Sequence, residues 1–185
     1  MNPQPRPAPP IELLLRPATP ADALCLGVLA TQVFLDTYAP EGIRPAIANE
    51  ALNAFSTHAF EQLLARPQTF IVVAEVRQHL VGFAQVSLGT PQALVMSPAP
   101  AELDRLYVQE PFTGRGVGTA LIHQAEADAQ QRGAHTLWLT PWVGNVRALR
   151  FYAKHGYVDL GATWFEMEQE RHENRVLALR LGSVA

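Results

Sequence analysis

Cysteine is almost absent from this sequence: Cys25 is the only one in 185 residues, so no internal disulfide can form. The chain also lacks the Cys/His spacing of a structural zinc site, and its 6 histidines are scattered without ligand spacing. We therefore expect no bound metal, and a reducing cytoplasm is the environment that fits best.

Long hydrophobic runs and an excess of positive charge are missing too. No stretch approaches the roughly 18 apolar residues of a membrane span, and the opening MNPQPRPAPP has no apolar core of a signal peptide. The net charge of −3 offers no general attraction to a polyanion, and an acidic balance mildly suits a cationic substrate. We expect a soluble cytoplasmic protein that binds neither nucleic acid nor a membrane.

Apolar sequence, by contrast, is sufficient for one buried core, since 48% of the residues are hydrophobic. Residues 1–10 are rich in proline, which predicts an extended tail ahead of a single domain over residues 11–185.

Hydrophobic periodicity predicts a mixed α/β fold built on one central sheet. The expected helices are 21–38, one or two within 46–66, one that follows Gly118 and ends at Gly133, and 145–155. The expected strands are 11–16, 69–76, 80–88, 102–108, 136–142, 157–167 and 175–181, with a loop over 89–100.

The stretch LDRLYVQEPFTGRGVGTAL, residues 103–121, runs from a strand through a glycine-rich loop into a helix. Its glycines at 114, 116 and 118 let the backbone approach a ligand closely, and a helix N-terminus offers N–H groups and positive dipole to an anion. The loop is therefore predicted to bind phosphates. Arg115 either adds a charge to this site or is a solvated surface residue.

Two common phosphate ligands do not fit this loop. A Walker loop ends in Gly-Lys-Ser/Thr, whereas this loop ends in Gly118, Thr119 and Ala120. A dinucleotide fingerprint reads GxGxxG after the first strand, whereas this loop reads GxGxG and lies in the middle of the chain. ATP and NAD are both disfavoured.

A second informative block, GNVRALRFYAKHGYVDLG, begins at Gly144. Asn145 and Tyr152 are separated by about two helical turns, so they lie on nearly one face of the predicted helix. Both can point at one ligand. Alternatively, Asn145 caps the helix and Tyr152 packs in the core.

Together these blocks resemble the GNAT acetyltransferases. Gly116 and Gly118 match the Q/R-x-x-G-x-G/A pyrophosphate motif of that superfamily, and the GNVRALRFYAKHGYVDLG block is similar to its second signature. The resemblance implies the GNAT acyl-CoA N-acyltransferase fold, a mixed but mostly antiparallel sheet flanked by helices, with acetyl-CoA as cosubstrate. The coenzyme-binding residues that it implies are Leu106, Tyr107, Val108, Thr113, Gly114, Arg115, Gly116, Val117, Gly118, Thr119, Asn145 and Tyr152.

The resemblance also implies individual roles. Asn145 would contact the pantetheine arm, and Tyr152 would be the general acid that protonates the departing thiolate. Thr113 stands where the family usually has Gln or Arg, so one side-chain contact to the pyrophosphate is weakened or replaced by Arg115.

A proton acceptor is also required, because an amine near its free pKa of about 10 is mostly protonated at neutral pH and cannot attack a thioester. Glu102 lies where some relatives carry a base, and it is the first choice for this role. Asp104 shares the strand face of Glu102. Alternatively, no side chain acts as the base and water accepts the proton.

The acceptor-binding residues in such proteins come from the first helices and the last strands. The FLDTYAP and GATWFEMEQERHENRVLALRL segments make the PaiA-type spermine/spermidine acetyltransferases the closest likeness within the family. Phe34, Tyr38 and Trp142 are expected to line a pocket for a cationic amine, with further candidates at Asp36, Trp164 and Glu166.

The predicted function is transfer of acetyl from acetyl-CoA to a primary amine, in a small amine, a polyamine or a peptide, by direct attack in a ternary complex. Cys25 falls in an apolar helical segment, so a buried residue is expected there rather than a covalent acetyl carrier. The alternative is a catalytically weak acyl-CoA-binding regulatory module. A homodimer, formed through a strand such as 175–181, is a further expectation.

Overall fold

The computed structural model describes residues 12–167 and 170–182. The tail predicted at residues 1–10 lies outside this range. The strands are β1 Leu13–Pro17, β2 Thr69–Val76, β3 His79–Leu88, β4 Pro100–Val108, β5 Thr136–Leu139, β6 Val158–Met167 and β7 Glu170–Arg180. The helices are α1 Ala23–Tyr38, α2 Pro45–Ala54, α3 Thr57–Leu64, α4 Val117–Gln131 and α5 Val146–Lys154, with short 3-10 turns at Pro20–Asp22 and Glu110–Phe112.

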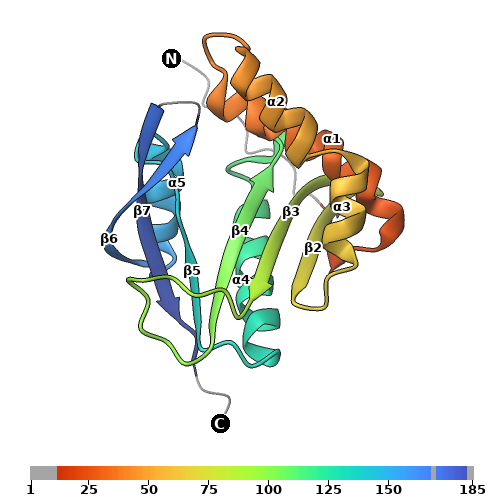
Figure 1. Cartoon of the computed structure of the whole chain (residues 1–185). Helices are drawn as coiled ribbons and strands as arrows, with labels where there is room; N and C mark the ends of the chain where they lie inside the picture. The colour runs from red at the N-terminus through yellow and green to blue at the C-terminus, as the bar shows by residue number, and fades with distance from the viewer. Residues whose placement is uncertain (1–11, 168–169, 183–185) are drawn as a thin grey trace, which may run out of the picture.

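All seven strands form one sheet in the order β1-β2-β3-β4-β5-β7-β6 (Figure 1). Every pair is antiparallel except β4 and β5, which are parallel and joined by α4. A parallel pair requires such a crossover, whereas the β2–β3 hairpin needs only the two residues Arg77 and Gln78 in the left-handed region. The sheet is thus mixed and mostly antiparallel, as the sequence predicted.

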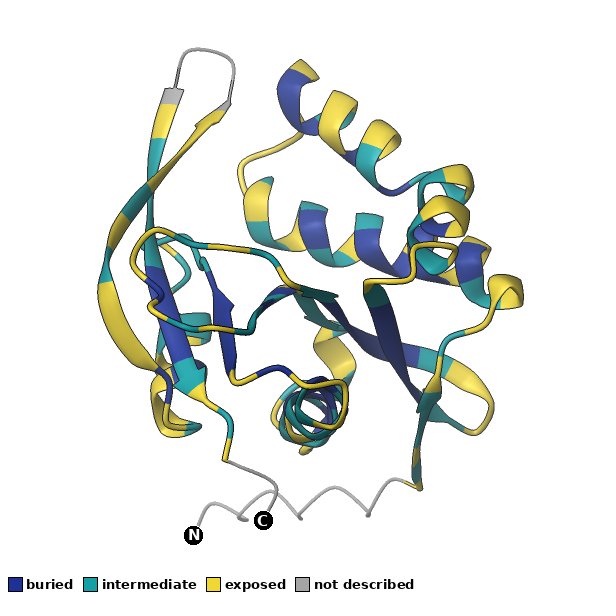
Figure 2. Ribbon diagram, turned by 60° about the horizontal axis from the view of Figure 1, so that its bottom comes forward, coloured by how far each residue is buried: buried dark blue, intermediate teal, exposed yellow. Residues whose placement is uncertain are grey.

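Helices cover both faces of this sheet (Figure 2). Helices α1, α2 and α3 pack over one face, around a core that includes Leu26, Phe60 and Phe83. Helix α4 packs against the other face, and its Val117, Leu121 and Ala125 are completely buried, as expected for its inner stripe. The two cores hold the strands rigidly, so the loops at the ends of β4 and β5 are carried on a fixed frame.

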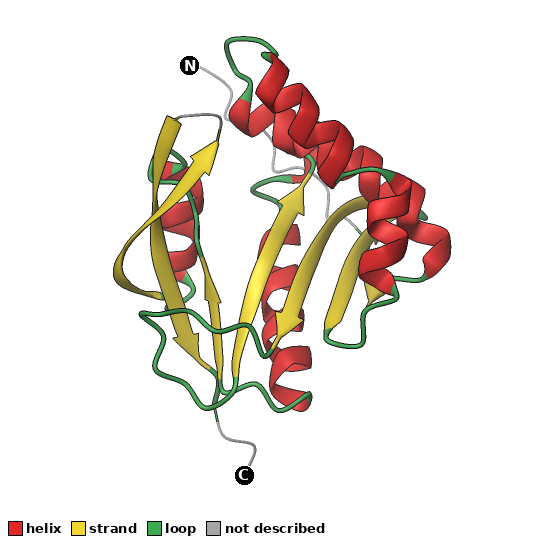
Figure 3. Cartoon of the chain, viewed as in Figure 1, coloured by secondary structure: helices red, strands yellow, loops and turns green. Residues whose placement is uncertain are grey.

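The long loop between β3 and β4 crosses β5 and β7 (Figure 3). Val95 of this loop is buried with Trp138 and Val176, and the Trp138 indole N–H donates to the carbonyl of Thr90 at 3.0 Å. This packing covers the part of the sheet that the helices leave open.

Strands β4 and β5 pair over only three positions, the last of which joins Glu102 to Trp138. Beyond that pair the strands part, and the outer half of β4 has no partner on this side. Strand β5 ends at Leu139, three residues earlier than predicted, and Pro141 lacks the N–H that would continue the ladder. The split leaves a free backbone edge in the middle of the sheet.

Three further expectations need correction. Strand β7 starts at Glu170, whereas residues 175–181 were predicted, and it lies between β5 and β6. It therefore has no free edge, and the prediction that this strand pairs with a second copy of the chain is wrong. Cys25 is exposed on α1, because it lies on the face opposite the buried Gly27 and Phe34.

Candidate active site

The glycine-rich loop leads from the end of β4 into the first turn of α4. Gly114 and Gly116 have φ values of 68° and 86°, which an L-residue adopts only with strain. An added Cβ would meet nothing within 4 Å at either position, so the glycines serve the backbone path and not close packing. The loop as folded therefore needs glycine at both sites.

The start of α4 presents backbone N–H groups at this loop. Gly116 is the N-cap, and its carbonyl accepts the first intrahelical hydrogen bond, from the Ala120 N–H at 2.9 Å. The N–H groups of Val117, Gly118 and Thr119 precede that bond and so have no acceptor within the helix. Together with the helix dipole they form a site suited to an anion.

Two side chains of the loop have contacts of their own. The Thr113 hydroxyl donates to the Glu110 carbonyl at 2.9 Å, so it stabilises the preceding 3-10 turn. The Arg115 guanidinium lies 6.0 Å from the centroid of the Phe112 ring. The phosphate-binding capacity of this loop rests mainly on the backbone.

The outer half of β4 forms one wall of the split. The Gln109 N–H donates to the Val81 carbonyl of β3 at 3.0 Å. Because N–H groups alternate in direction along a strand, the Val108 N–H points the other way, toward the split. Leu106 shares this direction, whereas Tyr107 turns its N–H toward β3. The edge can therefore bond an extended ligand as an added strand would.

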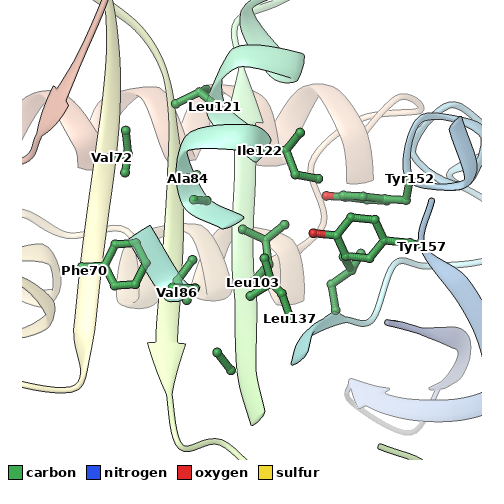
Figure 4. Packing of buried hydrophobic residues seen from close by; sticks show 14 of the residues in the cluster. Phe70, Val72, Ala84, Val86, Leu103, Leu121, Ile122, Leu137, Tyr152 and Tyr157 are labelled. Atoms are coloured by element: carbon green, nitrogen blue, oxygen red, sulfur yellow. The ribbon is translucent and has the colours of Figure 1, made fainter. Parts of the chain in front are cut away.

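Tyr152 of α5 lies across the split from β4. Its side chain is 8% exposed and packs with Tyr157 and Phe151, and its hydroxyl points toward β4 (Figure 4). Among residues 12–167 and 170–182 no group forms a hydrogen bond with this hydroxyl. Burial raises the pKa of Tyr152 well above its usual value, so the phenol is a neutral proton donor at physiological pH.

Asn145 is the N-cap of α5, and its Oδ1 accepts a hydrogen bond from the Ala148 N–H at 3.0 Å. The capping interpretation is thus correct as far as the oxygen is concerned. The amide nitrogen is not used by the cap and remains a donor for a ligand. Asn145 also lines a small cavity of about 240 Å³ that reaches Val108 on the opposite wall.

A larger cavity of about 800 Å³ lies between the end of α1, the loop before α2, the middle of β4 and the β6–β7 hairpin. Phe34, Tyr38 and Trp142, the three residues predicted to bind the acceptor, all line it. Of the other candidates, Asp36 lines the smaller cavity, and neither Trp164 nor Glu166 lines either one.

A β-bulge places two adjacent residues of β4 on the wall of the larger cavity. Gln85 of β3 pairs with Arg105 and the next residue, Val86, pairs with Leu103, so Asp104 is the extra residue. Asp104 and Arg105 therefore both line the cavity, although neighbours on a regular strand point to opposite faces.

Glu102, the predicted base, lies at the point where β4 and β5 part, opposite Trp138. It is half-buried and is not among the residues that line either cavity. Burial, followed by the charge of Asp104, raises the pKa of Glu102 to about 7, and Arg105 opposes that rise. Burial also raises the pKa of Asp104, against a hydrogen bond from Ser87.

Three phenols connect the larger cavity with the split. Burial raises the pKa of Tyr107 to about 12, and the nearby phenol of Tyr38 adds to that rise. The same two phenols raise the pKa of Tyr152, after the larger effect of its burial. Thr37 and Trp142 line both cavities, so the larger cavity adjoins the smaller one that Val108 and Asn145 line.

Several cavity residues were not found by sequence reasoning. Some of them lie in segments that the sequence analysis singled out, and Phe165 was missed by one position, since Trp164 and Glu166 were chosen instead. The unforeseen lining residues that bear polar or aromatic groups are Thr37, Glu41, Arg44, Glu50, Phe55, Arg105, Phe165, His172 and Asn174.

Taken together, a split between parallel strands, a helix start suited to an anion and a buried phenol across the split are the features that a coenzyme-dependent acyltransferase requires. The model of the acetyltransferase (GNAT) family matches residues 37–157. An uncharacterised N-acetyltransferase of Mycobacterium tuberculosis is 31% identical over 164 residues, which cover 86% of this chain and 97% of that protein. The chain therefore belongs to the GNAT acetyltransferase family.

Solved structures show the same fold. The PaiA N-acetyltransferase from Thermoplasma acidophilum, in complex with coenzyme A, matches with a TM-score of 0.71 at 20% identity, over 92% of this chain and 99% of that one. A protein from Salmonella typhimurium with its cofactor acetyl-CoA matches with a TM-score of 0.65 at 17% identity, over 94% and 96%.

Proposed function

We propose that this protein transfers the acetyl group of acetyl-CoA to a primary amine by direct attack in a ternary complex. The observation that carries the proposal is the split between β4 and β5, which has the start of α4 at β4's end, Tyr152 across from β4 (Figure 4), and the larger cavity against Asp104, Arg105 and Tyr107 of β4. The coenzyme diphosphate binds the amides at the start of α4, and the pantetheine arm lies along Leu106 and Val108. The amine enters from the cavity.

The amine nitrogen attacks the thioester carbonyl carbon with its lone pair. The Val108 N–H, directed into the split, stabilises the oxyanion that forms. The carbon–sulfur bond then breaks, its electron pair goes to sulfur, and Tyr152 supplies the proton that completes the thiol. Solvent restores the phenol.

The attacking amine loses its proton to Glu102. A carboxyl group with a pKa of about 7 is partly ionised at neutral pH and binds a proton more readily than an ordinary glutamate. Because Glu102 lies at the apex of the split and not on the cavity wall, the proton reaches it through water. Asp104, on the wall, holds the ammonium form before attack.

Cys25 has no part in this scheme. It is exposed on α1 and lines neither cavity, so an acetyl-cysteine intermediate would form far from the amine. Direct transfer is therefore favoured because Cys25 lies outside both cavities. The sequence analysis favoured direct transfer for a different reason, the expected burial of Cys25.

A thiol-release assay with acetyl-CoA and a panel of primary amines tests the proposal, with calorimetric titration of coenzyme A alongside. We expect coenzyme A binding and acceptor-dependent thiol release. Tight coenzyme binding without release for any acceptor would favour the regulatory module instead. In that case the protein would hold acyl-CoA without turnover.

A further inference from the structure

The wall of the larger cavity carries a positive and a negative charge side by side. Asp104 accepts a hydrogen bond from the Ser87 hydroxyl at 2.8 Å, and the Arg105 Nη1 donates to the Gln85 Oε1 at 2.5 Å. Among the described residues, Asp104 and Arg105 form no ion pair with each other or with any other side chain. Each is held by a neutral group of β3, and both charges remain available.

The bulge explains why the two charges stay apart. It turns adjacent side chains toward one cavity, while Ser87 and Gln85 hold them at separate points of β3. Gln85 is 2% exposed, and a buried amide requires a hydrogen-bond partner, which Arg105 supplies. Positioning of Arg105 is thus built into the sheet.

The surroundings of Arg105 strengthen its attraction for an anion. Its guanidinium lies 5.3 Å from the centroid of the Phe55 ring, and Tyr107 lines the same cavity. Both neighbours are neutral and Arg105 is half-buried, so its charge is screened less than that of an exposed arginine. A planar guanidinium fixed in this way matches the two oxygens of a carboxylate.

We propose that the acceptor is an amine that also carries a carboxylate, as an amino acid does: its ammonium group binds beside Asp104 and its carboxylate binds Arg105. This inference rests on the proposed function, because it names the acceptor of the same site. The aromatic side chains of Phe34, Tyr38 and Trp142 take the remaining apolar part of the molecule.

A polyamine fits this wall less well. One of its ammonium groups can bind Asp104, but the chain then brings further positive charge toward the Arg105 guanidinium, at an electrostatic cost. At Asp104 and Arg105 the cavity thus favours two opposite charges over several like ones, which disfavours the polyamine among the acceptors expected from the sequence. Glu41, Arg44 and Glu50 line other parts of the cavity.

Matched pairs of acceptors test the proposal with the full-length protein and acetyl-CoA. The pairs are L-tyrosine with tyramine, L-phenylalanine with phenethylamine and L-lysine with cadaverine, and spermidine completes the set. A charge-assisted hydrogen bond changes affinity by about 10- to 100-fold. We therefore expect kcat/KM, measured by thiol release, to be higher by about that factor for the amino acid of at least one pair.

Substitution of Arg105 tests whether this residue causes the preference for the amino acid over its decarboxylated partner. Arg105→Met keeps an apolar chain over Phe55 and should raise KM for the amino acid while KM for its decarboxylated partner stays constant. Arg105→Lys should restore part of the preference, since it keeps the charge but not the planar fork. Arg66→Met, at an exposed arginine outside both cavities, is the matched control, and thermal unfolding verifies the fold of each variant.

Equal or better use of the decarboxylated amines, or an equal effect of Arg105→Met on both members of a pair, would overturn the inference. Failure of the proposed function gives a different result, namely no thiol release with any acceptor. Calorimetric titration of the same amino acids into the coenzyme A complex then shows whether the carboxylate site exists without turnover. Binding that is lost in Arg105→Met supports the carboxylate site even without turnover, and absence of binding refutes it.

Discussion

The coenzyme side and the acceptor side of this site are built in different ways. The proposed coenzyme side consists of two continuous segments, 106–119 and 145–152, and most of the binding groups proposed for it belong to the backbone. The acceptor cavity is formed by side chains from residues between Phe34 and Asn174, on helices, loops and three strands.

This difference determines how each side can vary. Backbone amides persist when side chains change, provided that the loop keeps its φ values, so the coenzyme side tolerates the replacement seen at Thr113. The cavity has no such protection, because a single substitution on its wall alters charge or shape directly. We expect coenzyme binding to respond to changes of backbone conformation and acceptor choice to respond to changes of side chains.

Loss of the Tyr152 hydroxyl should give the largest effect, because this group serves both sides. We expect Tyr152→Phe to lower kcat by about 10² to 10⁴ with little change in coenzyme A affinity, since general acid catalysis contributes on that order. Steady-state thiol release and calorimetric titration measure the two quantities. An unchanged kcat would contradict the acid role.

Glu102→Gln should give the next largest effect, about 10- to 100-fold in kcat/KM at neutral pH, because the variant lacks the proposed base. The kcat/KM of the parent should rise with pH through about 7, the pKa of Glu102, and this step should vanish in the variant. Glu61→Gln, on the exposed side of α3, is the control and should keep the step. A step that survives in Glu102→Gln would assign the titration to another group.

The same variant predicts a pH dependence of stability. The pKa of Glu102 is higher in the folded protein than its ordinary value of 4.5, so the folded state binds the proton more tightly. Glu102 therefore favours folding below its unfolded pKa, and that contribution is lost as the pH rises through about 7. Thermal unfolding at pH 4 and at pH 8 measures this contribution. The melting temperature of Glu102→Gln relative to that of the parent should be higher at pH 8 than at pH 4.

Gly116→Ala tests the backbone character of the coenzyme side. The substitution strains a residue with a φ of 86°, and relaxation of the loop should turn its amides and weaken coenzyme A binding about tenfold. Gly89→Ala strains a residue with a φ of 71° in equally open space, outside both cavities. It should cost similar stability and leave the affinity intact, and equal losses of affinity would refute the assignment.

Arg147→Ala should have the smallest effect. Arg147 and Glu110 form an ion pair at 2.9 Å on the wall of the smaller cavity, but their side chains are 69% and 64% exposed. Such pairs contribute about 0.5 kcal/mol or less to the free energy of unfolding. Chemical denaturation of the two proteins measures this difference, and a loss several times larger would show that the pair is structural.

The sequence predicted the loop and the helix start of the proposed coenzyme side because their signals are local. A strand, glycines at 114 and 116 and a helix follow one another in the chain, and their order alone indicates an anion site. Asn145 and Tyr152 share one helix, so their spacing could be related to a common face.

Apart from Phe34, Tyr38 and Trp142, most of the larger cavity could not be predicted in this way. The bulge at Asp104 depends on how β4 pairs with residues about 20 positions earlier, and no local pattern marks it. The choice of Trp164 over Phe165 failed because a shift of one residue reverses the face of a strand. The exposure of Cys25 depends on how α1 is rotated, which its apolar composition does not fix.

The structure of the protein with bound coenzyme A tests the central claim most directly. We predict that the diphosphate lies against the backbone amides of residues 115–119, and that the sulfur lies within hydrogen-bonding distance of the Tyr152 hydroxyl, at the end of the split that opens into the acceptor cavity. A diphosphate bound elsewhere, or a sulfur remote from Tyr152, would contradict the account.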